Sequence, residues 1–251
     1  MLNILAPSKT MNDTPLDSDN TWTTPLFLKQ AQTIVATLDR RDDIADFMNI
    51  SPALADQVNT MYQRWGQTTK PSVFMYRGDV YKGFYADTLT QHDLLWSQQH
   101  VMIASGLYGL LRPMDQISRY RLEMRTGLSV GGYKNLYEYW GDTLARVADE
   151  HADGIICILS AEEYARPIRK FSSSRIVTPV FMDHKPNGTV GQVPIYSKMM
   201  RGVMARWIID HRINDPAGLV GFDRFGYMYD ANRSKPDAPV FVRAKMTPLV
   251  F

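Results

Sequence analysis

Short apolar runs alternate along the chain with segments of helical spacing, and this alternation limits the possible folds most. The apolar runs predict strands at residues 2–5, 73–76, 101–104, 154–159, 176–181, 225–229 and 240–242. Helical spacing predicts helices at residues 26–38, 44–48, 51–65, 136–150, 161–168 and 197–212, with Ser51 and Ser160 as caps. This order is typical of an α/β (mixed α+β) fold whose mixed sheet is flanked by helices. Because no repeat or Pro/Ser-rich linker interrupts the chain, we expect one compact domain over residues 1–251.

Composition is that of an ordinary globular protein, with 45% hydrophobic and 22% charged residues. These fractions exclude a disordered chain and a disulfide scaffold. The single cysteine, Cys157, lies in an apolar run, so we expect a buried thiol in a reducing compartment. Pro7 cuts the apolar N-terminus short, which argues against a signal peptide. No stretch reaches the roughly 18 apolar residues of a membrane span, so we expect a cytoplasmic protein without membrane contact.

Charge is unevenly distributed along the chain, although the formal net charge is only +2. Residues 1–60 carry four basic and eight acidic side chains, whereas residues 195–251 carry nine basic and five acidic ones. A basic C-terminal quarter suits an anionic ligand, and it equally suits a solvated surface. Charge alone therefore leaves both interpretations open.

The segment from Ser105 to Pro113 leaves a predicted strand and carries two glycines, Tyr108 and Arg112. Ligands of α/β sheets gather beyond the carboxyl ends of strands, and glycine backbone N–H groups can hold an anion. The segment does not have the spacing of a phosphate-binding P-loop. It is either an anion-binding loop or a structural turn.

A second charged segment follows at residues 119–125. In an extended conformation, Arg119, Arg121, Glu123 and Arg125 would share one face, because side chains alternate along a strand. Such a row suits either an ion-pair network or a carboxylate or phosphate ligand. The segment 112–125 is net basic, which keeps both possibilities open.

Further charged residues lie near predicted strand ends or share a helix face. Arg77 and Asp79 flank a turn glycine, Lys9 follows the first strand, and Lys198 and Arg201 are three residues apart on a helix. A solvated hairpin tip or an exposed helix face is the commoner explanation for such residues, and an anion-binding cleft is the alternative. The five histidines and the cysteine show no metal-ligand spacing, and no nucleotide or hydrolase fingerprint occurs. We therefore expect no metal and no cofactor.

Several of these stretches together resemble the YaaA family of bacterial peroxide-stress proteins. The resemblance is carried by residues 4–10, 76–83, 105–113, 120–124, 137–142, Ser160 with Glu163 and Tyr164, and 198–205. It covers nearly the whole chain, and the stretches are specific only in combination. It implies a cytoplasmic DNA-binding protein that limits hydrogen peroxide damage by lowering available intracellular iron. It also implies a mixed α/β unit with a basic cleft and a helix-hairpin-helix element.

The chain departs from the family pattern at three places. Ala6-Pro7-Ser8-Lys9 stands where the family has Ser-Pro-Ala-Lys, Arg119 replaces a proline, and Arg125 replaces a glycine. The two arginines add positive charge beside the expected cleft.

The helix-hairpin-helix element maps best onto residues 43–65, with Asn49, Ile50 and Ser51 as candidate DNA contacts. Such hairpins normally use glycines to bring backbone N–H groups to a phosphate. Here Asn49 would have to adopt the unusual backbone angle. Several aspartates flank the hairpin and repel a phosphate backbone, so ordinary helical packing is the alternative.

Three functions remain in competition. The leading hypothesis is a DNA-binding stress protein; the alternative is an enzyme acting on a phosphate-containing or nucleic-acid substrate, and an iron-sequestering protein is the weakest. We expect a monomer whose partner is double-stranded DNA or another phosphate-bearing ligand. Lys9, Arg77, Arg112, Arg121, Lys198 and Arg201 are expected to converge, neutralised by an anion or by acids. The candidate cleft residues are Lys9, Arg77, Asp79, Ser105, Tyr108, Arg112, Arg121, Glu123, Ser160, Glu163, Lys198, Arg201 and Arg243.

Overall fold

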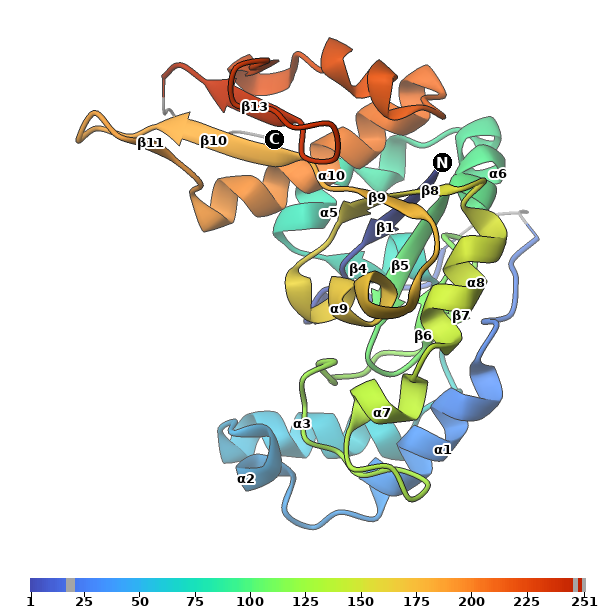
Figure 1. The fold of residues 1–251 in the computed structure, drawn as a ribbon. Coiled ribbons are helices and arrows are strands. Elements are labelled where there is room, and N and C mark those ends of the chain that lie inside the picture. The colour runs from blue at the N-terminus through green and yellow to red at the C-terminus, as the bar shows by residue number, and fades with distance from the viewer. Residues whose placement is uncertain (17–20, 246–247, 250–251) are drawn as a thin grey trace.

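Four parallel strands organise the fold, in a computed structural model that describes residues 1–16, 21–245 and 248–249 (Figure 1). They are β1 (Leu2–Leu5), β5 (Val101–Ser105), β8 (Ile155–Leu159) and β9 (Arg175–Val177). The antiparallel strand β6 (Gly109–Leu111) extends the sheet, whose order is β6-β5-β1-β8-β9. The expected strands at residues 2–5, 101–104 and 154–159 are therefore confirmed, and the sheet is mixed as expected.

A second mixed sheet contains the C-terminal strands, in the order β11-β10-β13-β12. Its members are β10 (Val180–His184), β11 (Val190–Gly191), β12 (Tyr227–Tyr229) and β13 (Val240–Arg243). The central pair β10 and β13 is parallel, and Asp183 lies opposite Arg243. Two short ladders pair β2 (Thr10–Met11) with β4 (Tyr76–Arg77), and β3 (Lys70–Pro71) with β7 (Gln116–Ile117). Together the elements form a single compact α/β fold.

Helices surround the central sheet. The first six are α1 (Leu28–Asp39), α2 (Ile44–Met48), α3 (Pro52–Gln63), α4 (Ser72–Met75), α5 (Asp79–Phe84) and α6 (Gln91–His100). They are followed by α7 (Leu136–Trp140), α8 (Thr143–His151), α9 (Glu162–Phe171) and α10 (Pro194–His211), with 3-10 turns at Ala86–Thr88, Pro216–Gly221 and Arg224–Gly226. Helices α6 and α10 contact β1, whereas α8 contacts β8 and α9 contacts β5. No helix in the described ranges is long and apolar enough to span a bilayer.

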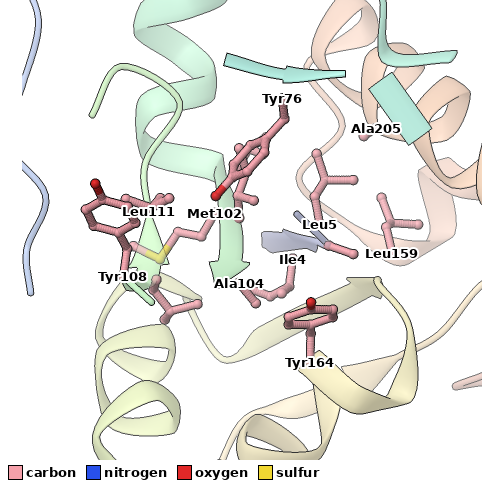
Figure 2. Close-up of a cluster of buried hydrophobic side chains, with 14 of the residues drawn as sticks. Ile4, Leu5, Tyr76, Met102, Ala104, Tyr108, Leu111, Leu159, Tyr164 and Ala205 are labelled. Carbon is pink, nitrogen blue, oxygen red and sulfur yellow. The ribbon is translucent and has the colours of Figure 1, made fainter. Parts of the chain in front are cut away.

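The core lies between the central sheet and these helices. Ile4, Leu5 and Ala104 are completely buried, and aromatic rings such as Tyr76 and Tyr108 enter the same cluster from other segments (Figure 2). Cys157 is completely buried on β8, as expected, and burial raises the pKa of its thiol to about 12. The thiol is therefore a packing group in the native protein.

Helices α5 and α10 pack against each other at backbone distance. Gly202 on α10 faces the carbonyl oxygen of Val80, and Gly83 on α5 faces the carbonyl oxygen of Met199. A Cβ atom at either glycine would overlap that oxygen, so only glycine permits this approach. The two helices therefore form one rigid pair.

Several boundaries differ from the sequence expectations. Residues 73–75 of the strand expected at 73–76 belong to the helical turn α4, and only Tyr76 begins a strand, β4, because an apolar run this short is buried equally well as a helix. The helix expected at 136–150 is divided into α7 and α8, and the strand expected at 176–181 is divided between β9 and β10. Ser51 caps α3 through the amide of Leu54, but Ser160 caps nothing: Ala161 is the N-cap of α9.

The helices of the expected hairpin are present, but a helix-hairpin-helix element is not shown. Asn49 has φ 50° and ψ 57°, the left-handed conformation that the hairpin would need. Its backbone N–H donates to the carbonyls of Ala45 and Asp46, and that of Ile50 donates to Ala45. These N–H groups already have acceptors inside the turn, so they are not available to a phosphate as the structure stands.

Candidate functional site

A cavity of about 870 Å³ lies at the carboxyl ends of β1 and β8. It is lined by residues 6–10 after β1, residues 77–82 and 85–87, Glu123, Arg125, residues 161, 163 and 164 after β8, and Lys198 and Arg201. Strand β1 has β5 on one side and β8 on the other, so the strand order reverses here. In open α/β sheets such a switch point is the usual ligand site.

One wall of the cavity is a chain of ion pairs. The Lys9 ammonium contacts the Glu123 carboxylate, whose second oxygen lies 2.8 Å from Nε of Arg125. The same Nε lies 3.9 Å from Oε2 of Glu163. Tyr120, Leu122 and Met124 are buried, whereas Arg119, Arg121, Glu123 and Arg125 keep exposed surface, so burial alternates along this segment as expected. Two carboxylates and two cations thus share this wall.

The opposite wall is built by β4 and α5. Gly78 has φ 108°, and a Cβ atom there would approach Oγ of Ser8 to 2.7 Å, so glycine lets this turn lie against the loop after β1. Arg77 pairs with Asp87 at 3.1 Å, and Lys82 approaches Asp79 at 3.9 Å. All four side chains belong to lining residues, and each cation on this wall has an acid near it.

Lys198 and Arg201 lie one turn apart on α10 and complete the lining. Within the described part of the chain, neither side chain has an ion pair or a hydrogen bond to a carboxylate. Lys198 is exposed and Arg201 is half-buried, and burial lowers the pKa of Arg201. A half-buried guanidinium without a carboxylate favours binding of an anion from solution.

Buried tyrosines lie in and behind the cavity wall. The hydroxyl of Tyr120 is 2.7 Å from both the Tyr76 hydroxyl and Oγ of Ser105, while Tyr81 donates to the carbonyl of Ala6. Burial raises the pKa of Tyr120 to about 12, so these phenols stay neutral. Ser105 accepts from the amide of Tyr108, and both residues are almost completely buried. Tyr76, Ser105 and Tyr108 lie behind the cavity wall, whereas Tyr81 lines the cavity itself and Tyr120 lines a small neighbouring recess.

Three other candidates also lie away from the cavity. Arg112 pairs with the buried Asp115 at 2.8 Å and donates to the carbonyl of Thr24. Arg243 pairs with Asp183 in the second sheet, where both are nearly completely buried. Ser160 is buried, and its hydroxyl has no hydrogen-bond partner in the described structure. Arg112 and Arg243 do not line the expected cleft, because each is held elsewhere by an ion pair with a buried carboxylate. The sequence pattern does not reveal that these carboxylates are buried.

Seven of the candidates line one cavity: Lys9, Arg77, Asp79, Glu123, Glu163, Lys198 and Arg201. Arg121 lines a small recess beside it, together with Lys9 and Glu123. Of the six cations expected to converge, Lys9, Arg77, Lys198 and Arg201 do so, and Arg112 does not. Sequence reasoning missed Lys82 and Asp87, although Lys82 lies three residues after Asp79 on one helix face.

The fold and cavity define an α/β protein with a charged, ligand-sized site at a switch point of its sheet. The family model described as "Peroxide stress protein YaaA" matches residues 1–233. A UPF0246 protein of Bordetella pertussis is 42% identical over 97% of this chain and 99% of its own length. A UPF0246 protein of Shewanella oneidensis is 40% identical with the same coverage. The chain therefore belongs to the YaaA family of peroxide stress proteins.

Proposed function

We propose that this chain acts in the cytoplasm as a peroxide-stress protein that binds a phosphate-bearing ligand in the switch-point cavity. Duplex DNA is the first candidate ligand. The observation that supports the proposal is the position of Lys198 and Arg201, which line the cavity without a carboxylate partner in the described chain. Phosphate is the anion that such a pair suits best, because Arg and Lys donate charge-assisted hydrogen bonds to its oxygens.

The paired cations have a different part in this proposal. Lys9, Arg77 and Arg125 are already compensated by Glu123, Asp87 and Glu163. A phosphate entering beside them must compete with those carboxylates, so they supply less net attraction. Binding is therefore carried mainly by Lys198 and Arg201, with the remaining cations setting the orientation.

Removing both α10 cations is expected to weaken DNA binding and its salt dependence. For wild-type protein, four to six neutralised phosphates imply a slope of log K on log salt of about −4 to −5. The Lys198→Ala/Arg201→Ala variant should flatten that slope by about two units, equally for unrelated sequences. Fluorescence anisotropy with labelled duplexes across a potassium chloride series measures both quantities.

The matched control is Lys29→Ala, which removes an exposed cation on α1 at the other end of the molecule (Figure 1). Its slope should stay close to that of the wild type. Asn49→Asp tests the hairpin, and it should leave binding unchanged because the turn N–H groups have internal acceptors. Loss of binding in Asn49→Asp with retention in the double variant would place DNA on the hairpin instead.

An enzyme acting on a phosphate-containing substrate is the second candidate. It is favoured by Glu123 and Glu163, because binding of a phosphate backbone has no need for carboxylates beside the cations. A screen of phosphate esters and nucleotides with wild-type protein and Glu163→Gln tests this function. Turnover that the variant lacks would make the cavity an active site.

The effect on iron is proposed to be indirect. Among the described residues, no cluster of three His, Cys, Asp or Glu side chains is arranged to hold a metal ion. We expect anaerobic titration of the purified protein with ferrous iron to show no stoichiometric site of submicromolar affinity. One ferrous ion bound at that affinity would mean that the protein acts on iron directly.

A further inference from the structure

Lys9 is the lysine of the cavity wall that is formed by ion pairs with Glu123 and Glu163. It follows β1 in the loop at the switch point, and its ammonium contacts Glu123. Its side chain keeps an exposed fraction of 54%, so a ligand in the cavity can reach the amine. Lys82, by contrast, approaches Asp79 on the opposite wall at 3.9 Å. The Lys9 amine is therefore accessible to a ligand, and the Glu123 carboxylate that it contacts can accept its proton.

Burial and neighbouring cations make the Lys9 ammonium easier to deprotonate than that of a free lysine, although the contacting Glu123 carboxylate stabilises the charged form. Partial burial and the nearby cations Arg121, Arg125 and Lys198 lower its pKa, and Glu163 acts in the opposite direction. A neutral amine is a nucleophile, whereas an ammonium is not. The Glu123 carboxylate is positioned to take the proton that the amine must lose.

We propose that the amine of Lys9 forms an imine with the carbonyl carbon of a ring-opened sugar phosphate held by Lys198 and Arg201. This inference rests on the proposed function, because the phosphate site positions the carbonyl. The same chemistry is offered by a free sugar phosphate and by an abasic deoxyribose within DNA. Both carry an aldehyde close to a phosphate.

The step balances without an oxidant or a reductant. Lys9 loses one proton to Glu123, and its lone pair attacks the carbonyl carbon while the carbonyl electron pair moves to oxygen, which takes up a proton. The nitrogen of the adduct then loses a second proton, which the carbinolamine oxygen takes up before it leaves as water. The nitrogen lone pair forms the C=N bond, so the protonated imine keeps the third proton of the original ammonium. Glu163, which lies 3.9 Å from the same Arg125 Nε that Glu123 contacts, is the second carboxylate available for these proton transfers.

Reductive trapping tests the proposal. Full-length protein is incubated with ribose 5-phosphate and cyanoborohydride, and its intact mass is measured. Imine formation followed by reduction adds the mass of the sugar phosphate less one oxygen atom, and peptide mapping should place the adduct on Lys9. Ribose without phosphate should be trapped about tenfold more slowly. A duplex with a single abasic site forms the second arm, and the faster of the two arms identifies the source of the carbonyl.

Five variants make the result specific. Lys9→Arg keeps the charge without a primary amine and should abolish trapping, while Lys29→Arg on α1 should trap as the wild type does. Glu123→Gln should slow trapping by about tenfold or more, and Glu123→Asp should recover part of the rate. The Lys198→Ala/Arg201→Ala variant should need higher ribose 5-phosphate concentrations than the wild type to reach the same rate of trapping.

Binding of inorganic phosphate, measured by calorimetry, separates the two proposals. Phosphate binding that depends on Lys198 and Arg201, without an adduct on Lys9, overturns the imine and leaves the proposed function intact. Absence of both phosphate binding and the adduct overturns both. Adducts spread over surface lysines and unchanged in Lys9→Arg also overturn the imine.

Discussion

Replacing Gly202 by alanine is expected to lower the free energy of unfolding by about 3 kcal/mol or more. The added Cβ atom would overlap the carbonyl oxygen of Val80, which belongs to the backbone of α5 and cannot rotate away. Alanine gains only about 1 kcal/mol over glycine in a helix interior, so the overlap decides the sign. The helices must separate, and the α10 cations move with them. Urea denaturation followed by circular dichroism measures the loss.

The control for this substitution is Gly127→Ala, because no atom lies within 4 Å of a Cβ built there. Its unfolding midpoint should stay within experimental error of the wild type. A Gly202→Ala variant as stable as Gly127→Ala would show that α5 and α10 are not in backbone contact. Phosphate binding by any folded Gly202→Ala protein should also weaken, since Lys198 and Arg201 lie on the displaced helix.

Replacing Asp183 by alanine is expected to cost about 3–5 kcal/mol of stability, the usual result of leaving one partner of a buried ion pair behind. Asp183 is completely buried and accepts from Nε of Arg243 at 2.7 Å and from the Tyr227 hydroxyl at 2.9 Å. The guanidinium also lies 4.7 Å from the ring centre of Tyr196, at the start of α10. One carboxylate therefore joins β10, β12 and β13. Urea denaturation again provides the measurement.

A double variant separates the charge from the packing. Asp183→Leu/Arg243→Met removes both charges and should recover much of the stability, because well-packed apolar groups often replace buried ion pairs without loss. A cost below about 1 kcal/mol for Asp183→Ala would instead describe a solvated pair. Arg243 would then be accessible to a ligand, as the sequence interpretation expected.

Local pattern predicted those parts of the fold that bury an apolar run within one element. The runs at residues 2–5, 101–104 and 154–159 are strands as expected, and the helix after Ser51 begins at Pro52. Residues 73–75 were predicted wrongly, because so short a run of buried apolar residues carries no period that separates a helical turn from a strand. Prediction of the site residues was limited in the same way, because local sequence does not reveal which ion pairs become buried in the fold. Lys9 and Glu163 follow strands and reach the cavity, whereas the partners of Arg112 and Arg243 had to be seen in three dimensions.

The strand order has a consequence for how the protein is made. β1 precedes its two neighbouring strands in the chain by a long stretch, since Asn3 pairs with Val101 on one side and with Cys157 on the other. Such long-range pairing slows folding. The cavity waits longer still, since Lys198 and Arg201 come from α10. A nascent chain therefore keeps the β8 edge of β1 unpaired until residues 156–159 are made, and it cannot hold a ligand until α10 follows.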